Sequence, residues 1–181
     1  DREATVYGAN RYSYKEYYER VTLLASGLEK RGIKAGDVVA TILPNIPAQV
    51  EAHFGIPALG AVINTINTRL DVKTVAYIFD HGEAKIVIVD SQFLSLAEDA
   101  KKICESSGPE IIEVQDLNSG FIKTGKYLEY EELLKTGDEN FDWKMPDDEW
   151  QALSLSYTSG TTGNPKGVVY HHRGSYLMST G

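Results

Sequence analysis

The sequence predicts an α/β fold, in which a mixed, largely parallel sheet is flanked by helices, and the alternation of its segments carries that prediction. Short apolar stretches rich in valine and isoleucine recur along the chain, and segments of helical periodicity separate them. Repeated strand and helix units are typical of a parallel or mixed sheet whose faces are covered by helices. The composition agrees, because 42% hydrophobic and 24% charged residues in a chain of 181 residues are usual for a globular domain.

The first helix is the best-defined element of the sequence. Ser13 and Glu16 have the spacing of a capping box, and an apolar face continues to Leu28 before Gly32 ends the helix. Three tyrosines lie on this face, and their helical spacing favours a place in the core over a role as a stacking platform. They are Tyr14, Tyr17 and Tyr18.

The elements that follow alternate between strand and helix. The stretch 38–43 is short, apolar and β-branched, as a strand covered on both faces would be. A helix begins at Pro47 and extends to residue 60, and Pro57 should kink or break it because proline lacks the backbone donor. The further elements are an extended stretch at 62–63, a helix capped by Asp71 through residue 79, a strand over 85–90, a helix over 93–105 and a strand over 110–114.

The C-terminal part of the chain breaks this rhythm. We expect residues 1–117 to form an α/β subdomain, and residues 118–150, rich in Lys, Glu, Asp and Gly, to pass over the surface with a short helix at 127–134. Residues 151–181 should form a strand, a glycine-rich loop, a second strand and the start of another helix. The first residue is Asp rather than Met, and a new periodic segment opens at the end, which suggests one incomplete domain cut from a longer chain.

Charge and cysteine content exclude some classes of partner. The chain has 18 Lys and Arg residues against 26 Asp and Glu residues, a net charge of −8, so we expect no nucleic-acid partner. No apolar run approaches the roughly 20 residues that cross a bilayer, and we expect a soluble protein without a membrane span. A single cysteine, Cys104, cannot form an internal disulfide, which favours a reducing compartment and a cytoplasmic location. We interpret Cys104 as a small hydrophobic residue without chemistry.

We predict no metal site. The carboxylates at 147–149 are contiguous and follow Pro146, and such a run is typical of a solvated turn because ligation needs converging oxygens. His53 and His81 fall in helical segments and belong to no cluster with metal-ligand spacing. We expect both histidines to be exposed or packed in the core.

The segment most suited to chemistry joins two expected strands. Residues 153–157 alternate between apolar and polar, as in a half-buried strand, and residues 168–170 are expected to form the second strand. The loop between them contains three glycines, four hydroxyl residues and one lysine. They are Gly160, Gly163, Gly167, Thr158, Ser159, Thr161, Thr162 and Lys166.

These residue types suit a polyphosphate ligand. Glycines permit positive φ angles, which let successive backbone N–H groups turn inward around an anion, and hydroxyls add further donors. Lys166 can place a compact positive charge against phosphate oxygens. The spacing differs from that of the mononucleotide P-loop, because Lys166 is followed by Gly167 and a strand rather than by a hydroxyl residue and a helix. The alternative from composition alone is an ordinary hydrophilic hairpin turn, which uses the same residue types.

The string over 157–173 resembles the signature phosphate loop of the adenylate-forming (AMP-binding) superfamily. That superfamily includes acyl-CoA synthetases, firefly-type luciferases and the adenylation domains of peptide synthetases. The segments 12–28, 36–40 and 58–70 are similar to the N-terminal subdomain of an acyl-CoA synthetase.

The resemblance implies an enzyme that uses ATP and Mg²⁺ to activate a small or medium carboxylic acid as an acyl-adenylate and then passes the acyl group to coenzyme A. It also implies that the β- and γ-phosphates are held by Thr158, Ser159, Gly160, Thr161, Thr162, Gly163 and Lys166. Gly167 and His172 would support this loop, and His171 and Arg173 would add positive charge. The residues for catalysis, adenine and Mg²⁺ would lie beyond this chain, so no catalytic residue is predicted within it.

Two alternatives stay open beside the acyl-CoA synthetase. One is an amino-acid adenylation domain, which shares the chemistry, and the other is a module that binds nucleotide or polyphosphate without turnover. In the leading hypothesis the 181-residue chain is inactive alone, because it needs the remaining subdomains as partners. The surfaces that meet those subdomains would then be exposed and would favour self-association.

Overall fold

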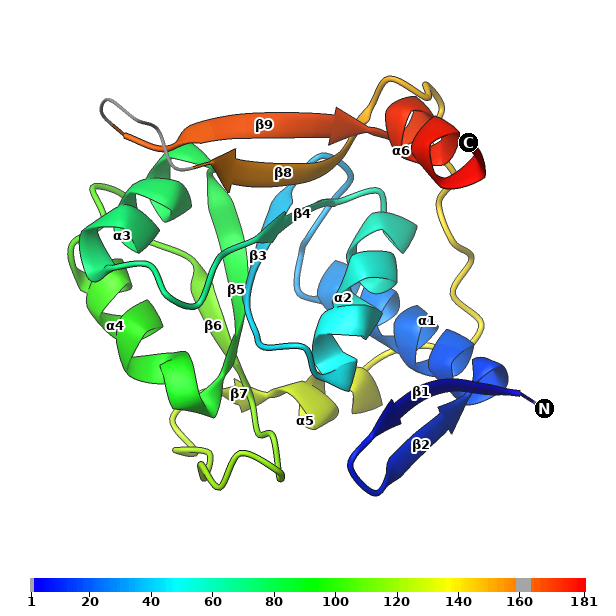
Figure 1. The fold of residues 1–181 in the computed structure, drawn as a ribbon, viewed down its shortest axis with the longest axis horizontal. Coiled ribbons are helices and arrows are strands. Elements are labelled where there is room, and N and C mark those ends of the chain that lie inside the picture. The colour runs from blue at the N-terminus through cyan, green and yellow to red at the C-terminus, as the bar shows by residue number, and fades with distance from the viewer. Residues whose placement is uncertain (1, 159–163) are drawn as a thin grey trace.

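The computed structural model describes residues 2–158 and 164–181, and a single large sheet forms its centre. Over these residues seven strands lie in the order β7-β6-β5-β3-β4-β8-β9, and a separate hairpin pairs β1 with β2 (Figure 1). The strands are β1 (Glu3–Tyr7), β2 (Asn10–Ser13), β3 (Val38–Ile42), β4 (Val62–Thr65), β5 (Ala84–Asp90), β6 (Glu110–Val114), β7 (Leu128–Glu129), β8 (Ala152–Thr158) and β9 (Lys166–His171). The helices are α1 (Tyr14–Lys30), α2 (Pro47–Ala58), α3 (Val72–His81), the 3₁₀ turn η1 (Ser91–Phe93), α4 (Leu94–Lys102), α5 (Tyr130–Lys135) and α6 (His172–Thr180).

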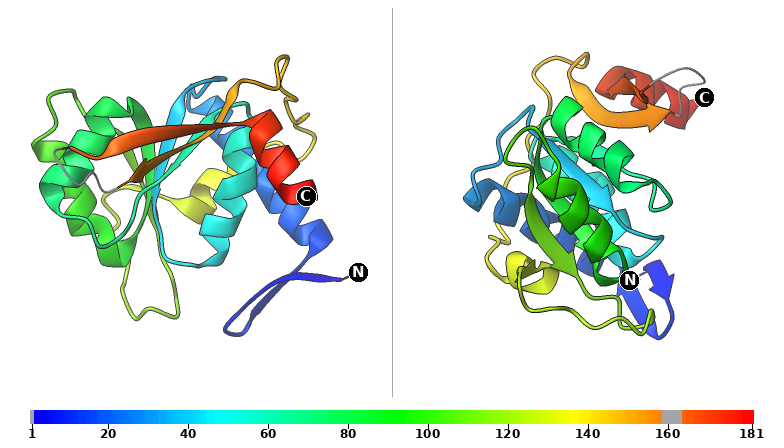
Figure 2. Two further views of the ribbon diagram at one scale, coloured as in Figure 1. Left: turned by 45° about the horizontal axis from the view of Figure 1, so that its top comes forward. Right: turned by 90° about the vertical axis from the view of Figure 1, so that its left-hand side faces the viewer.

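The sheet is parallel apart from one edge strand. Neighbouring strands from β7 to β8 run parallel, whereas β9 returns antiparallel beside β8. Helices α1, α2 and α5 cover one face, and α3 and α4 cover the other (Figure 2). The predicted fold class, a mixed, largely parallel sheet flanked by helices, is therefore confirmed.

Two apolar cores, one on each face of the sheet, hold these layers together. On β5, Ile86 and Ile88 pack toward α1 and α2, while Val87 and Val89 pack toward α3 and α4. This division follows from the period of two residues with which side chains change face along a strand. Because both faces are covered, the central strands are continuous apolar runs, as the sequence predicts for 38–43.

Helix α1 begins where the capping box predicts. The Ser13 hydroxyl accepts a hydrogen bond from the backbone N–H of Glu16, and the Glu16 carboxylate accepts one from the backbone N–H of Ser13. The expected place in the core is wrong for Tyr14, which is 61% exposed, and for Tyr18, which is 53% exposed, whereas Tyr17 is partly buried. The first turns of α1 lie beside the β1–β2 hairpin rather than over the sheet, and burial begins only at Val21.

Two helices end earlier than the sequence predicts. Helix α2 ends one residue after Pro57, and Gly60, with a φ of +81°, then turns the chain into β4. Helix α4 ends at Lys102, so Cys104 lies just beyond it. Burial raises the pKa of the Cys104 thiol to about 11, with the nearby Asp80 adding to the shift. The thiol is protonated at neutral pH, in keeping with a residue that has no chemistry.

Residues 118–150 contribute to the core as well as to the surface. Strand β7 pairs with β6, and α5 begins at Tyr130 rather than at residue 127. Tyr130, Leu133 and Leu134 are buried against the face that α1 covers. The division of the chain into 1–117, 118–150 and 151–181 stays a prediction.

Candidate functional site

Strands β8 and β9 form the hairpin that holds the predicted phosphate loop at its end. Thr158, the last residue of β8, is the register partner of Lys166, the first residue of β9. Because β8 runs parallel to β4, Thr158 lies at the edge of the sheet where the parallel strands end, and ligands of open α/β sheets bind at that edge. The predicted phosphate-binding residues between the strands lie outside the described residues. They are Ser159, Gly160, Thr161, Thr162 and Gly163.

A groove of about 500 Å³ lies at the base of this hairpin. Thr65 and Asn67, which end β4 and begin the following loop, form one side of it, and Ser156 and Thr158 of β8 form the other. Pro165, just before β9, also lines the groove. Its volume falls within the range of small-molecule sites, and its walls present hydroxyl and amide groups that can bond a polar ligand.

Lys166 is placed to meet an anion at the mouth of the hairpin. Its side chain is exposed, and within residues 2–158 and 164–181 it makes no ion pair. Its register partner Thr158 is also exposed. A lysine and a threonine are therefore paired across the two strands where these open toward the predicted loop.

Tyr157 connects this hairpin to α3. Its hydroxyl is 2.7 Å from Nδ1 of His81, the last residue of that helix, in a hydrogen bond. The His81 ring stacks on Tyr77 one turn earlier, with ring centroids 5.1 Å apart, and Tyr157 meets both rings edge-on. Burial raises the pKa of Tyr157, and Tyr77 adds to the shift, so the phenol stays protonated.

The residues that follow β9 lie at the other end of the hairpin. His171 ends the strand, and its Nδ1 accepts a hydrogen bond from the backbone N–H of Gly174, so His171 caps α6. The guanidinium of Arg173 pairs with Glu149. The structure thus does not bring His171, His172 or Arg173 to the Lys166 end, because the length of β9 separates them (Figure 1).

His172 instead faces an apolar groove of about 760 Å³ between α2, the segment 143–146 and α6. Burial lowers the pKa of His172, so its imidazole is neutral at pH 7. Phe54 and Tyr176 supply exposed aromatic surface in the same groove. The supporting role of His172 at the phosphate loop stays a prediction, whereas its contribution to this groove is a feature of the fold.

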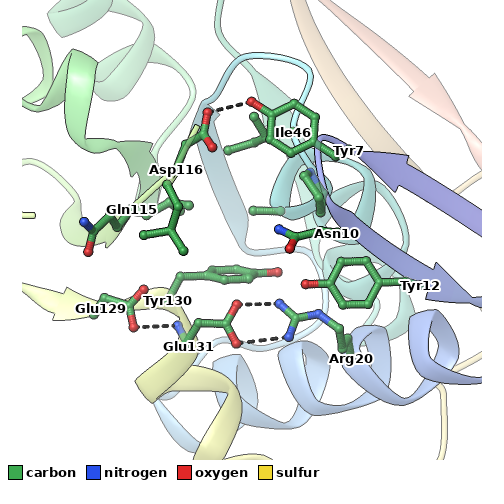
Figure 3. A pocket seen from close by; sticks show the side chains of 14 residues that line it. Tyr7, Asn10, Tyr12, Arg20, Ile46, Gln115, Asp116, Glu129, Tyr130 and Glu131 are labelled. Carbon is green, nitrogen blue, oxygen red and sulfur yellow. Dashed lines mark hydrogen bonds and ion pairs between the residues drawn. The ribbon is translucent and has the colours of Figure 1, made fainter. Parts of the chain in front are cut away.

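A further pocket of about 280 Å³ lies at the carboxyl ends of β3, β6 and β7 (Figure 3). Arg20 lies on its floor between two carboxylates, with Nε 2.6 Å from Oε1 of Glu51 and Nη2 2.6 Å from Oε1 of Glu131. The hydroxyl of Tyr130 donates to Glu51 at 2.7 Å. On the opposite wall, the hydroxyl of Tyr7 donates to Asp116 at 2.6 Å.

In this pocket Arg20 is already paired with two carboxylates, Glu51 and Glu131. Burial acts to lower the pKa of Arg20, but hydrogen bonds and charge from Glu131 and Glu51 outweigh it and raise that pKa. Tyr130 is fully buried, and its pKa is raised by burial and by the charge of Glu51. Since the cation already has two anionic partners, we interpret this pocket as the polar joint between α1, α2 and α5.

The described part of the chain holds no cluster of three or more His, Cys, Asp and Glu side chains that could bind a metal ion. In the acidic turn, the Asp148 carboxylate accepts a hydrogen bond from the backbone N–H of Trp150, and Glu149 pairs with Arg173. His53 bonds the backbone carbonyl of Gln49 within α2. These groups are engaged in local structure.

Comparisons with known proteins agree on one family. The profile described as AMP-binding enzyme matches residues 1–180. An acetate/butyrate–CoA ligase of Arabidopsis thaliana, described as peroxisomal, is 44% identical over 191 residues, which cover 98% of this chain and 33% of the ligase. An acetate–CoA ligase of Humulus lupulus is 45% identical over 189 residues, which cover 98% of this chain and 33% of that ligase. The crystal structure of an anthranilate CoA ligase in complex with anthranoyl-AMP matches with a TM-score of 0.90 at 23% identity, over 99% of this chain and 33% of that one.

A largely parallel sheet between two helical layers, with a hairpin loop at the carboxyl edge, is the architecture of a ligand-binding α/β domain. The chain belongs to the AMP-binding enzyme family. It spans about a third of the length of the curated relatives that it matches. The resemblance drawn from residues 157–173 is thereby confirmed.

Sequence reasoning missed the link between His81 and Tyr157. It treated His81 as exposed or packed in the core, and the side chain is exposed but hydrogen-bonded to Tyr157. The available signal was the spacing of Tyr77 and His81, which places two rings on one face of a helix. Nothing in the sequence indicates that this face meets a residue 76 positions away.

Proposed function

We propose that the full-length protein is an ATP-dependent acyl-CoA synthetase that activates a carboxylic acid as its acyl-adenylate and transfers the acyl group to coenzyme A. The observation that carries this proposal is the hairpin end, where Lys166 and Thr158 lie side by side next to a polar groove in a chain of the AMP-binding enzyme family. Within this chain the proposed role is to hold the triphosphate of ATP.

The task of the site is to offset negative charge. Attack of a carboxylate on the α-phosphorus brings like charges together and leaves pyrophosphate, so donors must hold the leaving group. We propose that the ammonium of Lys166 and the hydroxyl of Thr158 bind the β- and γ-phosphates, with Ser159, Gly160, Thr161, Thr162 and Gly163 as further donors. The overall charge of −8 does not oppose this, because salt confines distant carboxylates to weak effects beyond about 8–10 Å.

Two further components belong to the proposal. We propose that Mg²⁺ enters with ATP and is held by residues beyond this chain, which spans about a third of the length of its curated relatives. We propose a small carboxylic acid as the second substrate. The names of two similar ligases, acetate/butyrate–CoA and acetate–CoA ligase, support short acids as the first to test.

Exchange of labelled pyrophosphate into ATP tests the activity, with the full-length protein and a panel from acetate to aromatic acids. Exchange that depends on a short carboxylic acid supports the proposal, and its loss in Lys166→Ala assigns the phosphate site. Lys15→Ala is the matched control, because Lys15 is an exposed lysine whose ion pair in the described ranges is with Glu19 on α1. Exchange with amino acids alone would favour the adenylation-domain alternative. ATP binding without any exchange would favour a non-catalytic module.

The compartment and the assembly state are also proposals. No helix in the described ranges is long and apolar enough to cross a membrane. We propose a cytoplasmic location, with the peroxisome as the alternative that the names of several relatives support. Fluorescence microscopy of the tagged full-length protein decides between them.

Self-association of the 181-residue chain is proposed from its exposed apolar residues on β9 and α6. Val169 is 58% exposed and Met178 is 79% exposed. Light scattering that shows a clean monomer at high concentration would contradict this proposal.

A further inference from the structure

The hairpin end is anchored to α3 by one aromatic residue that contacts both strands. Tyr157 belongs to β8, and its register partner on β9 is Gly167. A Cβ atom at position 167 would lie 3.4 Å from Cζ of Tyr157 and 3.1 Å from Cδ1 of Leu155. The tyrosine ring therefore lies against the backbone of Gly167, so Tyr157 is in contact with both strands close to Thr158 and Lys166.

The ring of Tyr157 is in turn held from α3. Its hydroxyl and Nδ1 of His81 are 2.7 Å apart, and no other hydrogen bond to this hydroxyl is found in the described part of the chain. His81 is kept in orientation by stacking on Tyr77, at 5.1 Å and an interplanar angle of 26°. Stacking on Tyr77 therefore holds the imidazole with Nδ1 directed at the hydroxyl of Tyr157.

Buried side chains and hydrogen bonds hold the C-terminal end of α3, which carries His81, in place. Ile78 and Phe79 are buried in the core against β5 and α4. The Asp80 carboxylate accepts hydrogen bonds from the backbone N–H groups of Glu105 and Ser106, which fixes the helix end to the segment after α4. A Cβ on Gly82 would lie 2.8 Å from the Ile78 carbonyl oxygen, so the turn that follows His81 is closely packed as well.

This contact lies directly beside the loop. Tyr157, Thr158 and Pro165 line the groove on one side of the hairpin base. His81 and Asn164 line a second hollow of about 530 Å³ on the other side. The His81–Tyr157 pair thus stands between two hollows that border both ends of the loop.

We infer that His81 is a positioning residue for the proposed phosphate site: through Tyr157 it holds the hairpin end that carries Thr158 and Lys166, and so strengthens the binding of the ATP triphosphate. This inference rests on the proposed function, because it assigns the means by which the proposed phosphate site is held in its binding geometry. His81 itself need not touch the nucleotide.

The test is the dissociation constant of ATP, measured by calorimetry on the full-length protein and its variants. His81→Phe keeps a ring for stacking on Tyr77 but removes Nδ1, and Tyr157→Phe removes the hydroxyl. Each should weaken ATP binding about threefold to tenfold, the effect of losing one neutral hydrogen bond. The double variant should bind no more weakly than either single variant, because both changes remove the same bond. His81→Asn, which keeps a polar atom at the δ position, should restore part of the affinity.

Two controls separate positioning from general stability. Tyr17→Phe removes an equivalent tyrosine hydrogen bond, to the carbonyl of Val50, at the far side of the fold, and should leave ATP affinity unchanged. Lys166→Ala reports on the phosphate site itself. If Lys166→Ala weakens ATP binding while His81→Phe and Tyr157→Phe do not, the inference about His81 is overturned and the proposed function stands. If Lys166→Ala has no effect either, the proposed phosphate site is wrong, and the role of His81 is overturned with it.

Discussion

Arg20 and the buried carboxylate of Glu51 form a two-point ion pair that joins α1 to α2, with Nε–Oε1 and Nη2–Oε2 distances of 2.6 Å and 3.2 Å. The Glu51 side chain is only 1% exposed, whereas that of Arg20 is 19% exposed. The hydroxyl of Tyr130 supplies a third hydrogen bond to this carboxylate. The stability of the joint therefore depends on the guanidinium being present.

Arg20→Ala should lower the free energy of unfolding by about 3–5 kcal/mol, because it leaves a buried carboxylate without its cation. Urea denaturation followed by circular dichroism measures the change. Glu131→Ala is the matched control, since this second partner of Arg20 is 51% exposed and its loss should cost no more than about 1 kcal/mol. Equal losses of unfolding free energy in the two variants would show that the burial of Glu51 does not determine the cost of removing Arg20.

Lys166→Ala should weaken ATP binding by about 1–3 kcal/mol, the usual contribution of a charge-assisted contact, and leave thermal stability unchanged. The side chain is exposed, so its removal opens no cavity. Calorimetric titration with ATP, repeated with AMP, distinguishes the phosphates involved. Binding of AMP should change little, since Lys166 is proposed to contact the β- and γ-phosphates. An equal loss for both nucleotides would place the lysine elsewhere.

Gly137→Ala should destabilise the fold by about 1–3 kcal/mol through overpacking. A Cβ at this position would lie 2.7 Å from Cα and 2.9 Å from the carbonyl carbon of Leu23, and the backbone of α1 cannot yield as a flexible side chain could. The midpoint of thermal unfolding reports the loss. Glu139→Ala, a change at an exposed neighbouring position, should leave that midpoint within error of the unmodified chain.

The contribution of Asp90 to the free energy of unfolding should decrease as pH rises. Burial raises the pKa of Asp90, and the charges of Asp116 and Glu113 add to the shift. The folded state then keeps a proton that the unfolded state releases, so stability is lost as pH rises from the unfolded pKa of about 3.9 through the raised folded value. Asp90→Asn should therefore be more stable than the unmodified chain at pH 7, and the gain should vanish in acid.

Asp71 should show the opposite pH dependence of stability to Asp90. Hydrogen bonds from Thr74 and the first turn of α3 lower the pKa of Asp71. Its contribution to stability is present at neutral pH and is lost as pH falls through the lowered value. Asp71→Asn should consequently be less stable than the unmodified chain at pH 7. Denaturation curves at pH 3, 5 and 7 compare both variants, and the same sign of change at pH 7 would contradict the assignment.

The sequence predicts the elements whose signals are local. Ser13 and Asp71 act on backbone groups two or three residues away, and both caps form as expected. Strand β3 is identifiable because a run buried on both faces must be apolar throughout. Tyr14 and Tyr18 of α1 are exposed against expectation, because periodicity gives the apolar face of a helix but not how far along that face the packed neighbours extend.

At the candidate site, the sequence predicts a loop between two strands that includes both Thr158 and Lys166. In the structure these residues instead end β8 and begin β9, and they are register partners. The sequence does not predict the long-range contacts that hold the hairpin and the helices in place. His81 and Tyr157 are 76 positions apart, and Arg20 and Glu131 are 111 apart. Such pairs arise from the order in which strands and helices pack, which no short window of residues encodes.

The position of β9 at the border of the sheet bears on motion as well as on binding. Its backbone pairs with β8 alone, while β3 and β5 are paired on both sides and covered by helices. Amide hydrogens of β9 should exchange with solvent far sooner than those of β3, since opening the border disturbs few buried contacts. Strand β9 can therefore open locally while the centre of the molecule stays intact.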